Sequence, residues 1–261
     1  RENVFLDRSA GLNFEHIHDG TNGGPAVLFE ARVAEMQIRQ TGKYKVQLHQ
    51  GPTRHWQLES WITYELLEGG VIEMTFECVP RARTFEHDYI GLFFASYIEH
   101  PESKAIYFKG YDKSESDRKE RWIKATSPSH GFEAAHRGIN DERVFPHDPN
   151  FKLTLAFNES NYRYSEPWYY GISNGMALVF MFRDCDQVRF AQSPTGGGPG
   201  TPGYPHNPAW DFQWFIEDYE VGKRYKFVMR AMYVPFESRD QIVELTKPHR
   251  KALDDPCTDK R

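Results

Sequence analysis

The chain has 261 residues, of which 39% are hydrophobic, 26% charged and 15% aromatic, and its formal net charge at pH 7 is −5. This length suits one large all-β domain, and the composition is that of a globular protein rather than a disordered chain. No run approaches the roughly 18 consecutive apolar residues of a spanning helix, so we expect no membrane span. No concentrated block of lysine and arginine occurs, so we expect no nucleic-acid partner.

The first chemically suggestive segment is His16-Ile17-His18-Asp19, near the N-terminus. In a strand, residues i and i+2 point to the same side and lie about 6.6 Å apart. His16 and His18 could therefore share a divalent metal ion, or one of them could act as a base. Cupins use a similar pair of histidines but add a glutamate a few residues later, where this chain has Asp19 and Gly20. One divalent metal ion at His16 and His18 is thus an open expectation, and the sequence predicts no other cofactor.

Alternation of apolar and polar residues with a period of two dominates the chain and predicts strands. Either this alternation or a continuous apolar run predicts strands at residues 26–38, 43–50, 56–66, 72–78, 90–98, 104–109, 120–125, 151–157, 168–172, 175–182, 187–192, 210–217 and 225–233. One apolar and one polar face is typical of an antiparallel sheet that packs on a core. We therefore predict a large antiparallel β-sandwich, formed as a single domain by residues 1–261. Only the segment of about residues 238–253 is predicted to form a helix, and we expect Pro248 to interrupt this helix.

Turn sequences separate several of these strands. Glu68-Gly69-Gly70 and Thr41-Gly42-Lys43 each predict a hairpin, and Ser173-Asn174-Gly175 contains the Asn-Gly pair that favours a type I′ turn. Two longer loops stand out: 193–208 is rich in glycine and proline, and about 126–150 holds several histidines and arginines. Both could border a binding cleft, and a plain surface crossover is the alternative for the first.

Titratable residues stand near the ends of predicted strands. Arg54 and His55 precede one strand, His87 precedes another, and His206 follows the glycine-rich loop. Binding and catalytic groups are often placed on such connecting segments. We therefore name Arg54, His55, His87 and His206 as candidate catalytic residues. The alternative is that these polar groups only solvate turns.

Aromatic and polar residues alternate in two of the later predicted strands. A pyranose ring has an apolar C–H face that can pack on an aromatic ring, while its hydroxyls need polar partners nearby. The candidate substrate-binding residues are Trp168, Tyr170, Arg183, Trp210, Asp211, Gln213 and Arg230. Arg183 could bind a uronate carboxylate with two hydrogen bonds. Alternatively, the aromatic rings belong to the core and Arg183 pairs with an acid.

The three cysteines are Cys78, Cys185 and Cys257. An odd number prevents complete pairing within the chain, and one Cys78–Cys185 disulfide is compatible with the sequence. The chain begins at Arg1 instead of methionine, which fits the removal of a leader. We therefore expect an extracellular or periplasmic location.

The strand succession, the aromatic content and the polar residues on strand faces resemble the galactose-mutarotase-like super-sandwich group over most of residues 4–235. That group includes aldose epimerases and the sandwich domains of several glycosidases and polysaccharide lyases. The resemblance implies a super-sandwich fold and a carbohydrate as substrate. Aldose epimerases place a catalytic histidine and a glutamate base on different strands. Matched by residue type, these would be His87 or His206 with Glu73 or Glu217, but the local signatures of the epimerases are absent.

Together these features predict a carbohydrate-active enzyme that uses histidine and acid groups for general acid–base chemistry. Epimerase, lyase and glycosidase reactions all fit this prediction. A non-catalytic carbohydrate-binding module is one alternative, and it would depend on Trp168 or Trp210 instead of the histidines. A metal-dependent, cupin-like enzyme at His16 and His18 is the other. The sequence predicts neither the sugar nor the oligomeric state.

Overall fold

The computed structural model describes residues 4–5, 11–196 and 207–254, and strands are its main secondary structure. The strands are β1 (Asn13–His18), β2 (Met36–Gly42), β3 (Lys45–Gln50), β4 (Leu58–Leu66), β5 (Ile72–Pro80), β6 (Tyr89–Ala95), β7 (Ile106–Asp112), β8 (Arg121–Ala125), β9 (Ala135–Gly138), β10 (Glu159–Tyr164), β11 (Trp168–Ser173), β12 (Met176–Phe182), β13 (Arg189–Ser193), β14 (Ala209–Glu217) and β15 (Tyr225–Pro235). The helices are α1 (Pro25–Leu28), α2 (Glu30–Val33), α3 (Thr154–Phe157) and α4 (Arg239–Asp254). None of the described helices is long and apolar enough to cross a membrane.

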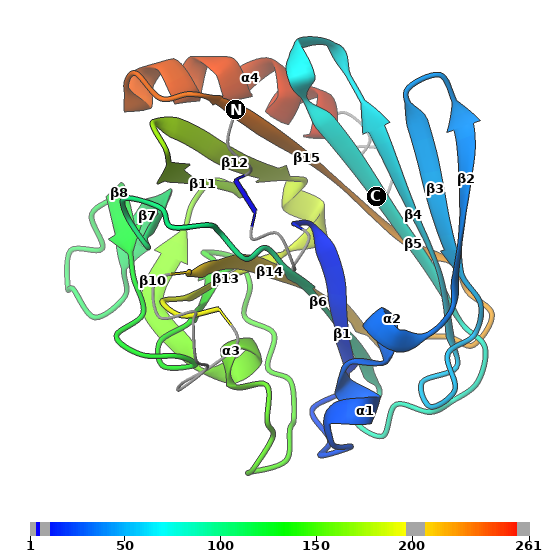
Figure 1. Cartoon of the computed structure of the whole chain (residues 1–261). Coiled ribbons are helices and arrows are strands. Elements are labelled where there is room, and N and C mark those ends of the chain that lie inside the picture. Colours follow the sequence, from blue (N-terminus) through cyan, green and yellow to red (C-terminus); the bar gives the residue numbers. More distant parts are fainter. Residues whose placement is uncertain (1–3, 6–10, 197–206, 255–261) are drawn as a thin grey trace.

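The strands form one continuous sheet that folds over on itself (Figure 1). Its order is β1-β6-β14-β13-β9-β10-β7-β11-β12-β15-β5-β4-β3-β2, with β8 paired to β7. Phe14 on β1 packs edge-on against Phe76 on β5, with 4.9 Å between the ring centroids, and Phe94 on β6 lies 5.3 Å from Phe227 on β15. The two ends of the sheet therefore face each other as layers, and the predicted β-sandwich is confirmed.

Aromatic side chains fill much of the space between the two layers. The buried rings of this core include Phe14, Phe76, Phe94, Tyr169, Phe180, Phe182, Phe190, Trp210, Phe212, Trp214 and Phe227. Several are stacked or edge-to-face, geometries that add about 0.5–1.5 kcal/mol per pair beyond the burial of area. Much of the unusual aromatic content therefore serves the core.

Strand β1 departs from simple alternation because a bulge inserts one residue. Phe14 pairs with Phe94 and His16 pairs with Phe93, so Glu15 has no opposite residue in the ladder. The extra residue allows Phe14 and Ile17, three positions apart, both to face the core. Glu15, His16 and His18 consequently point away from the core, to the outer face of this layer.

Helices α1, α2 and α3, together with the chain leading into α3, cover this outer face (Figure 1). Phe93 and Ala95 of β6 pack there against Phe151, Leu153 and Leu155 of the cover. This second apolar cluster makes the outer face of the layer an interior surface. Polar side chains that point to it are removed from bulk water.

Three secondary-structure predictions are wrong. Residues 26–38 form α1, α2 and only the first part of β2, because Pro25 opens α1 at a position that suits its fixed φ. Residues 151–157 end in α3; their alternate apolar residues cover the sheet but do not join it. Helix α4 continues through Pro248. The hairpin turn at Asn174 and Gly175 is confirmed, since both residues have the positive φ of a type I′ turn.

The Cys78–Cys185 disulfide is also wrong. Cys78 is a free, fully buried residue of the core, and burial raises the pKa of its thiol. Cys185 is disulfide-bonded. Cys78 therefore acts as a small apolar side chain and is unsuited to thiolate chemistry.

Two fully buried histidines make the fold sensitive to acid. Burial lowers the pKa of His18 and of His136 from 6.5 to about 3, because desolvation disfavours the imidazolium. Between pH 6.5 and about pH 3, the two histidines of the unfolded chain therefore bind more protons than those of the folded chain. Each histidine then lowers the free energy of unfolding by up to about 1.4 kcal/mol per pH unit as the pH falls.

We predict that the Tm falls steadily between pH 7 and pH 4, and that His136→Leu makes this fall shallower. Thermal melts of the wild type and the variant at half-unit pH intervals measure both slopes. The comparison uses the slope and not the Tm itself, because the variant also loses the 2.6 Å hydrogen bond between His136 and Ser160. Equal slopes in the two proteins would show that His136 is protonated in the folded state.

Candidate functional site

A cavity of about 230 Å³ lies between the outer face of the β1 layer and its cover. Its polar lining consists of Glu15, His16, Tyr97, His130, Lys152, Ser193, Thr195 and Asp211. Its apolar lining includes Phe29, Phe93, Leu153 and Leu155. The volume is below the roughly 300–1,000 Å³ of pockets that hold drug-sized ligands, so it suits a small one. An apolar wall with a few convergent polar groups is typical of a ligand site.

Glu15 is held in this cavity by three neighbours. Arg32 of α2 donates a hydrogen bond of 2.6 Å to Oε1, and the Tyr97 hydroxyl donates one of 2.9 Å to the same oxygen. His16 Nε2 lies 3.1 Å from Oε2. Burial alone would raise the pKa of Glu15, but these hydrogen bonds and the positive charge beside it lower the pKa overall. Glu15 is therefore ionised at neutral pH.

The same contact orients the imidazole of His16. A neutral His16 that donates its Nε2–H to Glu15 carries a lone pair on Nδ1. Nδ1 is buried and has no hydrogen-bond partner among the described residues. The ring is fixed further by Phe29, whose centroid lies 4.3 Å away in an edge-to-face contact. A base held in place by a carboxylate is a recurring catalytic arrangement.

Asp211 of β14 is the second acid of the cavity, and its pKa is shifted in the direction opposite to that of Glu15. Its Oδ1 accepts a 2.8 Å hydrogen bond from the backbone N–H of Ser96. Burial raises the pKa of Asp211 well above the usual range, and the negative charge of Glu15 raises it further. The protonated form of Asp211 is therefore favoured relative to that of an exposed aspartate. Two carboxyl groups with pKa values pushed apart mark an acid and a base.

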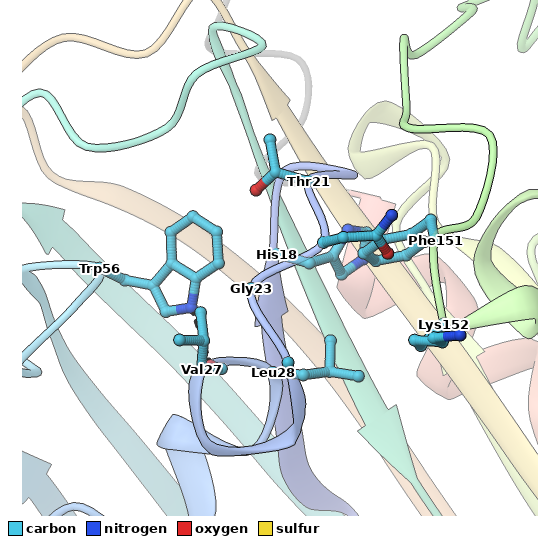
Figure 2. A pocket seen from close by; sticks show the side chains of 10 residues that line it. His18, Thr21, Gly23, Val27, Leu28, Trp56, Phe151 and Lys152 are labelled. Atoms are coloured by element: carbon cyan, nitrogen blue, oxygen red, sulfur yellow. Dashed lines mark hydrogen bonds between the residues drawn. The ribbon is translucent and has the colours of Figure 1, made fainter.

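His18 lies two residues beyond His16, beside a second, much smaller cavity of about 10 Å³ (Figure 2). Its ring is enclosed by Tyr89, Phe151, Phe157 and Phe215, at centroid distances of 5.3 to 6.5 Å. Both ring nitrogens are buried and lack a hydrogen-bond partner in the described structure. The two histidines thus share one face of β1 but have different surroundings.

A metal ion at His16 and His18 would find no complete ligand set in this part of the chain. Within the described residues, no group of three or more His, Cys, Asp and Glu side chains is arranged to hold one. His16 already contacts Glu15, and His18 faces aromatic rings. The divalent metal ion expected at these two histidines therefore stays a prediction.

Of the residues expected to bind substrate, Asp211 lies in the cavity. Gln213, on the same face of β14, is buried beneath the cover, where its Nε2 donates a 3.1 Å hydrogen bond to the carbonyl of Ala156. Trp210 points the other way, into the core, and its Nε1 donates to the carbonyl of Lys104. Trp210 therefore offers no ring face to a ligand.

The other four expected binding residues lie away from the cavity. Trp168 and Tyr170 are buried in a separate apolar cluster, which Ile242 and Leu253 of α4 join. Arg183 makes two 2.7 Å hydrogen bonds to Asp186, and Arg230 makes one of 2.9 Å to Glu73. These aromatic rings are core, and Arg183 pairs with an acid, which was the alternative interpretation.

None of the catalytic candidates that the structure describes lines the cavity of about 230 Å³. Arg54 and His55 are exposed on a turn. His87 is half-buried, and its Nδ1 lies 2.7 Å from the carbonyl oxygen of Asp19. His206 lies outside the described residues. Glu217, the partner suggested by residue type, is exposed at the end of β14.

Sequence reasoning missed Glu15, Arg32 and Tyr97, while it named His130 only as part of a loop near a cleft. The signal for Glu15 was present: the apolar residues Phe14 and Ile17 stand three apart within one strand. That spacing is compatible with a strand facing one core only if a residue is bulged out between them. Arg32 and Tyr97 carry no local signal, because the fold alone brings them to Glu15.

No protein-family model matches the chain, and no curated protein sequence matches it. Solved structures that resemble it include an α-N-acetylgalactosaminidase from Bifidobacterium bifidum, with 11% identity over 86% of this chain and 32% of that one, at a TM-score of 0.48. They also include a putative aldose 1-epimerase from Escherichia coli K12, with 10% identity over 86% and 82%, at a TM-score of 0.44. A heparan sulfate lyase from Pedobacter heparinus has 8% identity over 77% and 22%, at a TM-score of 0.39.

This chain spans about a third of the length of the galactosaminidase and less than a quarter of that of the lyase. The resemblance to galactose-mutarotase-like structures that the strand pattern predicted is found among the matches, including one from Lactobacillus casei at 10% identity, 78% and 74% coverage and a TM-score of 0.40. These likenesses concern the arrangement of the backbone. The chemistry of the site has to be derived from its own residues.

Proposed function

We propose that the cavity beside Glu15, His16 and Asp211 is the active site of an enzyme that moves protons to and from a sugar. The observation that supports this most is that the pKa values of its two carboxyl groups are shifted in opposite directions. The pKa of Asp211 is raised and that of Glu15 is lowered, so a protonated acid and an ionised carboxylate can stand together at one pH.

The roles follow from the hydrogen bonds. His16 Nδ1 accepts a proton from a hydroxyl or a carbon of the substrate, and Glu15 stabilises the imidazolium that forms. Asp211 gives its proton to the substrate oxygen on which negative charge develops. The reverse transfers restore both groups. Epimerase, lyase and glycosidase reactions each need such a pair of transfers.

The lining of the cavity supports a sugar as the substrate. Phe29 and Phe93 offer apolar surface to the C–H face of a ring, and Leu153 and Leu155 extend that surface. Tyr97, His130 and Ser193 place hydroxyl and imidazole groups beside it, where sugar hydroxyls could bind. The small volume fits one ring.

A location outside the cytoplasm is part of this proposal. The disulfide of Cys185 supports it, because disulfides persist mainly in oxidising compartments. A carbohydrate-active enzyme would meet polymeric substrates there.

Asp211→Asn tests the catalytic role of the acid. The amide keeps the shape of the side chain and can still accept the Ser96 N–H, but it has no acidic proton to give. We expect kcat/KM to fall about 10²–10⁴-fold with the fold intact. The assay follows new reducing ends, unsaturated products and anomer exchange on free aldoses and oligosaccharides, with Asp117→Asn on an exposed loop as the matched control.

Turnover by Asp211→Asn at the wild-type rate would remove Asp211 from the mechanism. If the wild type binds sugar but shows no turnover in any of the three assays, the proposal that it is an enzyme is wrong. The protein would then be a carbohydrate-binding module.

Tyr97→Phe tests the control of Glu15. Loss of the 2.9 Å hydrogen bond from the tyrosine hydroxyl raises the pKa of Glu15, because this bond favours the ionised carboxylate. We therefore expect the carboxylate absorption of Glu15, followed by infrared titration, to disappear at a higher pH than in the wild type. An unmoved titration would show that the Tyr97 hydroxyl does not stabilise the carboxylate. Arg32→Gln should move the titration in the same direction.

A further inference from the structure

We propose that the active-site cavity continues into a second subsite at His18, which receives the neighbouring ring of a longer carbohydrate. This inference rests on the proposed function and narrows its substrate class. The substrate would be a glycan of two or more rings rather than a free monosaccharide.

The first observation is the imidazole of His18. It is fully buried, and neither ring nitrogen has a hydrogen-bond partner in the described structure. A buried polar group without a partner destabilises a fold, so such groups usually meet a water molecule or a ligand. A leucine or phenylalanine would suit the surrounding aromatic rings better if packing were the only purpose of residue 18.

The second observation is that the neighbouring strand makes room for this ring. Gly91 of β6 pairs with His18 across the ladder. A Cβ atom at position 91 would lie 2.3 Å from Cε1 of His18, far inside contact distance. The imidazole can lie across β6 only because residue 91 is glycine, so its position depends on two strands.

The third observation is that the His18 cavity adjoins the main one. Leu28 and Lys152 line both cavities, so these two side chains form the wall between them. Figure 2 shows Leu28 below His18, with Val27 next to it, and Lys152 below Phe151 on the other side. Moving Leu28 and Lys152 aside would join the two cavities into one elongated cleft.

This wall is made of short, partly exposed elements. Helix α1, which carries Leu28, is only four residues long and has no buried residue, and Lys152 is exposed. Leu28 packs against the apolar cluster that includes Phe93 and Leu153, so the two cavities join only when this contact is broken. In the present state the His18 cavity holds about 10 Å³, room for about one water molecule.

The lining of the joined cleft matches a second sugar ring. Trp56, Val27 and Phe151 offer apolar surface, while His18, Thr21 and Asn22 offer hydrogen-bonding groups. Trp56 is held rigidly, since it stacks on Phe85 with 4.7 Å between centroids and its Nε1 donates to the carbonyl of Val27. The combination repeats the mixed surface of the first subsite.

Titration calorimetry with matched sugars of one and two rings tests the proposal: galactose and lactose, glucose and cellobiose, N-acetylglucosamine and chitobiose. We expect the two-ring member of at least one pair to bind ten-fold or more tightly than its one-ring counterpart. His18→Leu should abolish this gain and leave the one-ring affinity unchanged. Leu28→Phe, which narrows the passage, should also abolish the gain; because Leu28 lines both cavities, its readout is the ratio of the two-ring to the one-ring affinity.

His136→Leu is the matched control, because it removes another fully buried histidine with an unpartnered nitrogen, on the core side of the sheet. It should keep the two-ring gain. Equal affinity for both members of every bound pair, or an unchanged gain in His18→Leu and Leu28→Phe, would overturn the second subsite and leave the proposed function standing. Failure of all six sugars to bind would overturn the proposed function, and the subsite with it.

Discussion

The bulge at Glu15 is the constraint on which the candidate site depends. Without the extra residue, Phe14 and Ile17 could not both face the core, and His16 and Glu15 would lie on opposite faces of β1. With it, a carboxylate and an imidazole stand side by side on the covered outer face, 3.1 Å apart. The packing of the core therefore sets the geometry of the acid–base pair.

The cover of the outer face then determines the charge states. Because α1, α2, α3 and the chain before α3 exclude water, the carboxyl groups respond to their immediate neighbours rather than to solvent. Glu15 has Arg32, Tyr97 and His16 as partners and stays ionised. Burial raises the pKa of Asp211, and the negative charge of Glu15 raises it further. The cover that Phe151, Leu153 and Leu155 provide is thus part of the chemistry.

The sandwich could be predicted from the sequence because alternation and turn residues are local signals. The same signal failed at 151–157, where alternate apolar residues cover a sheet without joining it, and at 26–38, where two short helices intervene. For the site, Asp211 was predicted from its place beside aromatic residues. Trp168 and Trp210 were predicted to bind the substrate but lie in apolar clusters, because the same alternation of aromatic residues is also typical of a strand that packs on a core. Arg32 and Tyr97 were out of reach, because their partnership with Glu15 exists only after folding.

The central claim is that Asp211 is a neutral acid beside an ionised Glu15. Infrared difference spectroscopy between the wild type and Asp211→Asn at pH 7 tests it directly, because a protonated carboxyl group and a carboxylate absorb at different frequencies. The account predicts that the substitution removes the band of a protonated carboxyl group and leaves the carboxylate bands unchanged. Loss of carboxylate absorption instead would contradict it, since Asp211 would then be ionised and unable to act as the acid.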